Sequence, residues 1–97
     1  MIRHIVLLTL RDDAEPAAVD AIVDGLRALP AQIASIRSYE VGVDVGVSDG
    51  NATLAATALF DDVDGYLEYR DHPAHQRVIN ELIAPVRVGR AAVQFEV

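Results

Sequence analysis

The stretch "SYEVGVDVGVSDGNATLAATALF", residues 38–60, contains two consecutive segments with the character of β-strands. In residues 38–47 the side chains alternate strictly, so that Tyr39 and four valines share one face and small or polar residues share the other. Residues 48–51 have strong turn preferences, and residues 52–60 are again apolar. The pattern predicts two adjacent antiparallel strands joined by a hairpin turn.

A strand and a helix are expected before this hairpin. Residues 2–10, "IRHIVLLTL", form a short apolar run, which is typical of a strand covered on both faces. From residue 15 to residue 29 the apolar side chains recur at helical spacing. Asp13 is the expected N-cap of this helix, and Pro30 is expected to end it.

A second helix and a last strand are expected after the hairpin. Asp61 or Asp62 is the expected cap of a helix that begins near Val63 and ends at Pro85. A proline within this helix predicts an interruption or a kink. The remaining residues, 86–97, have the composition of a strand.

The order strand, helix, strand, strand, helix, strand predicts a ferredoxin-like α+β fold, a single domain over residues 1–97. Its four-stranded antiparallel sheet would carry both helices on one face, with the first strand in a central position. The other face would be apolar, and no segment remains to cover it. We therefore expect a homodimer in which two sheets pack against each other, consistent with the 52% hydrophobic content.

Charge and composition exclude several classes of partner. The net charge of −7 repels phosphate backbones and anionic lipids, so we expect neither a nucleic-acid partner nor a membrane partner. The absence of cysteine excludes disulfides and thiol chemistry. No apolar run approaches membrane-spanning length, and the first residues lack the features of a signal peptide, so a cytoplasmic location is expected.

Two of the three histidines lie within "YRDHPAHQRV", residues 69–78. Histidine is a suitable general base because its ordinary pKa is about 6.5, and a tyrosine hydroxyl can position it or stabilise an oxyanion. His75 and Tyr69 are six residues apart, and a bend at the intervening proline can bring them together. The third histidine, His4, shares a strand face with Val6, Leu8 and Leu10, and it could either line a cavity between the sheet and the helices or be a core residue.

Each of these residues also has a purely structural interpretation. His75 could bond the backbone that a proline frees, and His72 could end the first half of the helix because it precedes a proline. Tyr66 could be a core aromatic residue. Three imidazoles could also bind a metal, but two histidines around a proline do not have the usual zinc spacing, so we expect no side-chain metal site.

The segments "IRHIVLLTL", "IRSYEVGVDV", "LFDDVDGYLEYRDHPAHQRV" and "VQFEV" resemble the stress-responsive A/B barrel (Dabb) family, whose members are dimeric α+β barrels. Most of its members lack an assigned reaction. One member to which the chain is similar, olivetolic acid cyclase, closes a linear polyketide thioester by an aldol condensation without a cofactor. The resemblance implies that His75 and Tyr69 form an acid–base pair, that His4 assists them and that no cofactor is needed.

The resemblance also implies a set of substrate-binding residues, and several of them depart from the cyclase. Aliphatic residues stand where the cyclase has pocket aromatics or a glycine, so a different substrate is expected. The implied substrate-binding residues are His72, Tyr66, Ile22, Val23, Leu26 and Ile79. A magnesium ion bound by the backbone carbonyls of Pro30, Ile33 and Ile36 is a weak further implication.

The sequence therefore predicts a small internal pocket in a cyclase-like or related acid–base enzyme that acts on a carbonyl compound without a cofactor. One alternative is a non-catalytic, stress-associated homodimer that binds a small apolar ligand. Another is a cofactorless monooxygenase, a class that also uses dimeric barrels. The low aromatic content, 5%, makes an oxidation pocket the less favoured interpretation.

Overall fold

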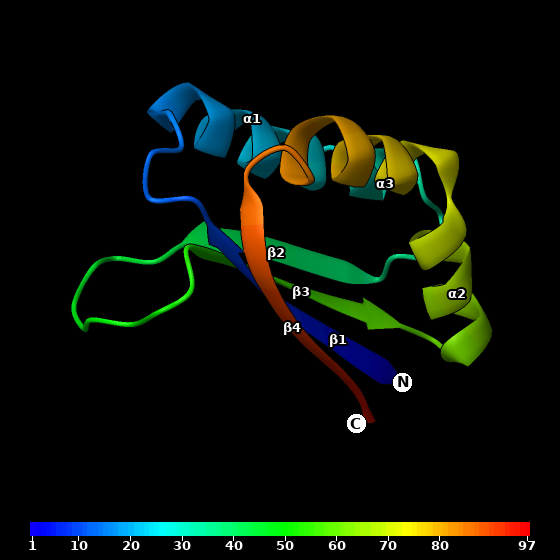
Figure 1. Ribbon diagram of the computed structural model, residues 1–97. Coiled ribbons are helices and arrows are strands. Elements are labelled where there is room, and N and C mark those ends of the chain that lie inside the picture. The colour runs from blue at the N-terminus through cyan, green and yellow to red at the C-terminus, as the bar shows by residue number, and fades with distance from the viewer.

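The computed structural model describes residues 1–97 and has the expected order of elements. The fold is a ferredoxin-like α+β fold in which all helices lie over one face of the sheet (Figure 1). The elements are β1 (Ile2–Leu10), α1 (Pro16–Arg27), η1 (Leu29–Ala31), β2 (Ser38–Val43), β3 (Leu54–Phe60), α2 (Val63–Asp71), α3 (Pro73–Arg77), η2 (Val78–Ile83) and β4 (Arg87–Glu96).

The sheet is antiparallel throughout and has the order β2-β3-β1-β4. The prediction that the first strand is central is therefore confirmed. In the register, His4 lies opposite Ala58 on one side and Gln94 on the other, while Leu8 lies opposite Arg90. Paired residues share a face of the sheet, so both ends of the chain supply side chains to the helix-covered face.

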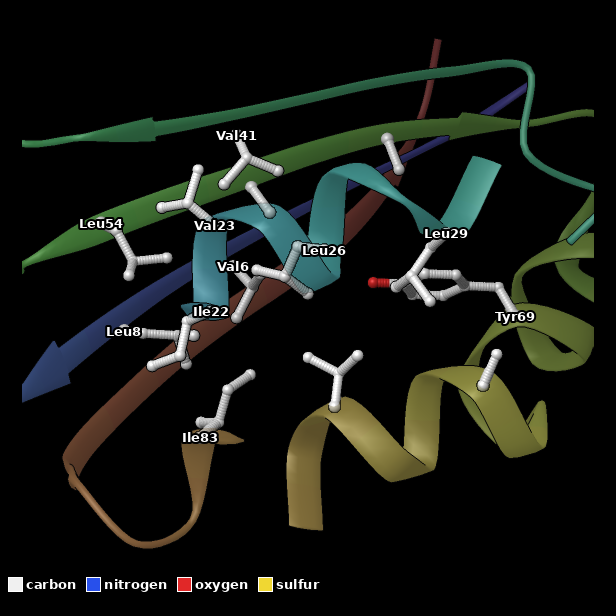
Figure 2. Close-up of a cluster of buried hydrophobic side chains, with 14 of the residues drawn as sticks. Val6, Leu8, Ile22, Val23, Leu26, Leu29, Val41, Leu54, Tyr69 and Ile83 are labelled. Carbon is white, nitrogen blue, oxygen red and sulfur yellow. The ribbon is translucent and has the colours of Figure 1, made fainter. Parts of the chain in front are cut away.

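The core fills the layer between this face and the helices. Ile22, Leu29 and Phe60 are fully buried, and Figure 2 shows side chains of α1 packed onto those of β1, β2 and β3. The opposite face is uncovered, and the Leu7 side chain there is 42% exposed. None of the helices combines the length and hydropathy needed to cross a membrane.

The hairpin between β2 and β3 differs from the prediction. β2 ends at Val43 and β3 begins at Leu54, so residues 44–53 form a long loop and not a short turn. The Asp44 carboxylate accepts hydrogen bonds from the Gly46 amide and the Asn51 side chain, which closes the loop on itself. Left-handed φ angles at two glycines of this loop also take the chain out of the extended conformation.

The predicted N-cap of α1 is wrong. Glu15 precedes Pro16 in an extended conformation and makes no side-chain capping bond. The Asp13 carboxylate instead pairs with Arg11, with 2.9 Å between nitrogen and oxygen. At the second helix the prediction is confirmed, because the Asp62 carboxylate accepts a hydrogen bond from the Gly65 amide at 2.8 Å.

The proline within the second helical region divides it into separate helices. His72 is extended, with φ −62° and ψ 135°, so α2 ends there and α3 begins at Pro73. The chain then widens into the π-helical turn η2, in which the Ala84 amide bonds the Ile79 carbonyl five residues earlier. The break at Pro73 and the wide turn η2 together determine which way the side chains of the segment between α2 and β4 point.

Replacement of Asp62 by alanine is expected to lower the free energy of unfolding by about 1 kcal/mol, because the cap of α2 loses its hydrogen bond. Urea denaturation followed by circular dichroism measures this loss. Asp64→Ala is the matched control, since Asp64 lies in the same turn without a capping bond. Equal losses in the two variants would contradict the capping role.

Candidate functional site

A cavity of about 120 Å³ lies between the helix-covered face of the sheet and the helical region α2 to η2. Its apolar wall comes from β1, α1 and η2. Four ring-bearing polar residues line it together, namely His4, Tyr66, Tyr69 and His75. Other hollows on the protein are open depressions, and this cavity is the one that contains histidines.

Tyr69 is one of the residues that line the cavity. It is 2% exposed, and its hydroxyl end points from α2 into the protein interior (Figure 2). The hydroxyl is hydrogen-bonded to that of Tyr39 on β2 at 2.9 Å. Burial, with Tyr39 nearby, raises the pKa of Tyr69 far above its ordinary value, so the phenol stays neutral and can only act as a hydrogen-bonding group.

His75 stacks on Tyr69, with 4.1 Å between the ring centroids and 26° between the ring planes. No hydrogen bond joins the two side chains. His75 Nδ1 lies 3.1 Å from the Arg70 carbonyl oxygen, which can only accept, so the ring proton is on Nδ1 and Nε2 keeps its lone pair. Burial lowers the pKa of His75, and it is therefore neutral at pH 7.

The break at Pro73 explains why this carbonyl is available. In a continuous helix the Arg70 carbonyl would accept from the Ala74 amide. That amide instead donates to the ring Nδ1 of His72, the N-cap of α3, at 3.0 Å. The His75 ring and the Gln76 side chain take its place on the Arg70 carbonyl.

His4 lies on β1 beneath these groups and is 4% exposed. Its ring is 5.0 Å from that of Tyr66 and 6.0 Å from that of Tyr69, between centroids. The Gln94 amide nitrogen donates to His4 Nδ1 at 2.8 Å, which leaves the ring proton on Nε2. Burial, followed by the charges of Arg90 and His75, lowers the pKa of His4 to about 4.

The two histidines are thus complementary at neutral pH. His75 presents an unprotonated Nε2, and His4 presents a protonated one. Both rings are neutral, so a proton can be accepted by one and a hydrogen bond donated by the other. The arrangement is suited to removal of a proton next to a carbonyl group.

Some predicted substrate-binding residues line the cavity and others do not. Tyr66, Leu26 and Ile79 contribute to its wall. Ile22 and Val23 are instead buried in the core against the sheet. His72 is also outside the cavity lining, because its ring caps α3.

Several residues of this site were not predicted from the sequence. Gln94 holds His4 in one tautomer, and Tyr39 binds the Tyr69 hydroxyl. Arg87 and Arg90 also line the cavity. The alternating pattern of the last strand was visible in the sequence, but its register against β1 was not.

The turn after α1 is where the sequence resemblance implied a magnesium ion bound by backbone carbonyls. The Ile33 carbonyl already accepts a bond from the Ile36 amide at 3.3 Å, and the Ile33 side chain is buried. Magnesium prefers carboxylates together with water, and these backbone oxygens are neutral. No cluster of three acidic or histidine side chains lies there or elsewhere. The turn therefore holds no side-chain ligand set for magnesium, and a site on its backbone carbonyls stays a prediction.

The sequence and the fold resemble those of known proteins. The family model of the stress responsive A/B barrel domain matches residues 2–97. An uncharacterised protein of Streptomyces coelicolor is 37% identical over 79 residues, which cover 78% of this chain and 80% of the relative.

Two solved structures resemble the chain over nearly its whole length. A dimeric ferredoxin-like protein of unknown function from Thermobifida fusca has a TM-score of 0.90 at 38% identity, with 99% of this chain and 90% of that chain covered. A hydroxynitrile lyase from Passiflora edulis has a TM-score of 0.83 at 18% identity, with 97% and 90% covered. The second likeness concerns the fold alone.

His4 should make the stability depend on pH. The pKa of His4 is about 4 in the folded protein, whereas the ordinary value of 6.5 applies to the unfolded chain. Between pH 4 and pH 6.5 the unfolded chain therefore binds more protons than the folded protein does. The free energy of unfolding should therefore fall as the pH drops from 6.5 to 4, by about 3 kcal/mol from this residue. Chemical denaturation across this range measures the effect.

The variant His4→Gln should lack this contribution, so its difference in stability from the wild type should shrink as the pH falls. His72→Gln is the control, and it should keep the full decrease because His4 is intact. A difference between wild type and His4→Gln that is constant from pH 7 to pH 4 would contradict burial of a neutral His4.

Proposed function

Because the chain belongs to the stress responsive A/B barrel domain family, we propose that its cavity catalyses proton transfer on a small carbonyl compound without a cofactor. The observation that supports this function is the pairing of two neutral histidines with opposite roles. His75 Nε2 is free to accept a proton, and His4 Nε2–H is free to donate a hydrogen bond. Both rings line one partly apolar cavity.

In the proposed reaction His75 removes a proton from the carbon next to the carbonyl. The C–H bond electrons move into the carbonyl group, and the enolate oxygen receives a hydrogen bond from His4. The Arg70 carbonyl, bonded to Nδ1, stabilises the imidazolium that forms on His75. Return of a proton to the same carbon gives exchange. Attack of the enolate carbon on a second carbonyl instead forms a C–C bond and an alkoxide, which takes the proton from the His75 imidazolium and becomes the aldol product.

Tyr69 has a positioning role in this proposal. Its ring stacks on His75 and restricts the imidazole orientation. Because the Tyr39 and Tyr69 hydroxyls share one hydrogen bond, a Tyr39 donor leaves the Tyr69 proton free for the substrate oxygen. A hydroxynitrile lyase from Passiflora edulis has the same fold, so the fold itself is compatible with catalysis.

A binding protein without turnover is the second candidate. The mostly apolar lining of the cavity favours it, because an apolar ligand could fill the space without reaction. The two candidates differ in one measurable respect. Only the enzyme moves a proton between solvent and the bound compound.

We also propose that the uncovered sheet face pairs with the same face of a second copy. Leu7 alternates with the buried residues of β1, and Val93 and Phe95 of β4 share its face of the sheet. All three side chains are more than 40% exposed. Contiguous apolar surface of this kind is typical of an interface. The 38% identical protein of Thermobifida fusca is dimeric, which supports the proposal.

Exchange of solvent deuterium into the α-position of acetone or acetaldehyde tests the catalytic proposal. His75→Gln should slow the protein-dependent exchange by about 10² to 10⁴-fold, because the general base is lost. His72→Gln is the matched control, since that ring caps α3 and lies outside the cavity lining. NMR measures the exchange.

Tyr69→Phe should have a smaller effect than His75→Gln, because the stacked ring remains. Absence of protein-dependent exchange in the wild type, or equal slowing in the His72 and His75 variants, would contradict the proposed base. Binding without exchange would favour the non-catalytic candidate.

The proposed dimer predicts a sedimentation mass of twice the 10.5 kDa of the chain at micromolar concentration. The double substitution Leu7→Glu and Val93→Glu should lower the sedimentation mass to that of the monomer, because it places charges on the sheet face that the dimer would bury. Val63→Glu is the control, since Val63 is exposed at the start of α2, away from that face. A wild-type monomer would contradict the pairing.

A further inference from the structure

We propose that the compound bound in this cavity carries a carboxylate, which is held by Arg90 with the assistance of Arg87. The substrate class is then a small oxo acid, with its carboxylate at the arginines and its carbonyl group at the histidines. This inference rests on the proposed function for the position of the carbonyl group. Its own basis is the distribution of charge around the cavity.

The positive charge of an acidic protein is concentrated at this cavity. The chain has 15 acidic residues and only 8 basic ones, all of them arginine. Three of the eight, Arg70, Arg87 and Arg90, line the cavity, and no aspartate or glutamate lines it. Both cavity histidines are neutral, so the charge of the lining comes from these arginines. The lining is therefore cationic in a chain of net charge −7.

Arg87 and Arg90 also differ from most other arginines in their partners. Four of the other six arginines have a partner. Arg11, Arg37 and Arg70 each form an ion pair with an aspartate, and Arg27 donates a hydrogen bond to the Val41 carbonyl. Arg87 and Arg90 form neither an ion pair nor a side-chain hydrogen bond. Their guanidinium groups are therefore free to bind an external anion, and a carboxylate matches the planar fork of arginine.

The register of the sheet brings Arg90 to the histidine pair. Arg90 lies opposite Leu8, and Gln94, which bonds His4, lies four residues further along the same face of β4. The charge of Arg90 contributes to lowering the pKa of both His4 and His75. Its guanidinium is therefore within electrostatic range of both rings, and all three residues line one small cavity.

The size of the cavity limits the ligand. A dry cavity of roughly 150 Å³ holds one benzene molecule, so about 120 Å³ accommodates a compound of about four to six heavy atoms. A carboxylate accounts for three of these atoms. A short 2-oxo or 3-oxo acid fits, with the carboxylate and the carbonyl separated by at most one carbon.

Binding of a carboxylate would also strengthen the base. Arg90 contributes to lowering the pKa of His75, and an anion beside Arg90 offsets part of this effect. His75 would therefore be a stronger base in the complex than in the free protein. An oxo acid would accordingly exchange its α-protons faster than a neutral ketone of similar size.

Binding of pyruvate to the full chain, measured by NMR chemical-shift titration at low ionic strength, tests the inference. Arg90→Gln should weaken pyruvate binding at least tenfold, and Arg87→Gln should weaken it severalfold. Arg77→Gln is the matched control, because Arg77 is exposed and outside the cavity lining, and its replacement removes the same charge. It should change the affinity by less than twofold.

Two further probes distinguish a carboxylate site from a general anion site and from a neutral carbonyl site. Acetone binding should be unchanged in Arg90→Gln, since acetone carries no charge. Inorganic phosphate should bind more weakly than pyruvate, and tighter phosphate binding would overturn the carboxylate assignment. Equal weakening in the Arg77 and Arg90 variants would overturn the assigned residues. Arg90→Lys, which keeps the charge, should bind with intermediate affinity.

The failure of this inference differs from the failure of the proposed function. His75→Gln should lose exchange, whereas the pyruvate binding that remains in it should still be weakened by Arg90→Gln, because the arginines are intact. Exchange of acetone in the wild type without arginine-dependent pyruvate binding would overturn the oxo acid class alone. Arginine-dependent binding without any exchange would overturn the catalytic proposal alone.

Discussion

The missing amide hydrogen of Pro73 is the constraint on which the candidate site depends. The Tyr69 carbonyl cannot bond to residue 73, so α2 ends and His72 becomes extended. The Arg70 carbonyl is then free to accept a hydrogen bond from His75 Nδ1–H. This bond fixes the tautomer of His75 and holds its ring against Tyr69. One covalent property of proline thus determines which histidine nitrogen is available to a ligand.

A second constraint is electrostatic. Burial keeps both cavity histidines neutral, and Arg90 reinforces this because a positive neighbour disfavours an imidazolium. Arg90 and Arg87 have no carboxylate partners of their own. The cavity is therefore neutral at the histidines, where chemistry is proposed, and cationic at the arginines, where a carboxylate is proposed to bind. The two properties are linked, because the arginine charge helps to keep the histidines neutral.

The fold was predictable from local patterns, and the predictions that failed did so for local physical reasons. The alternation of β1 placed His4 on one face with Val6 and Leu8, because side chains of a strand alternate regardless of context, and the structure shows that the helices cover this face. The predicted length of β2 was too great, because the Asp44 carboxylate bonds to its own loop. The predicted cap of α1 was wrong, because Asp13 pairs with Arg11. Side-chain bonds of this kind compete with strand and helix and leave no periodic signal.

For the candidate site, the sequence by itself determined the residue types and their order along the chain. It indicated Tyr69, His75 and His4, whose catalytic role stays a proposal, and it located a break near Pro73. Only the tertiary structure decided that Gln94 and Arg90 meet the first strand, and that His72 and His75 have different surroundings. The physical reason is that strand register joins residues about ninety positions apart, and it is set by the packing of the helix-covered sheet face and not by any local preference.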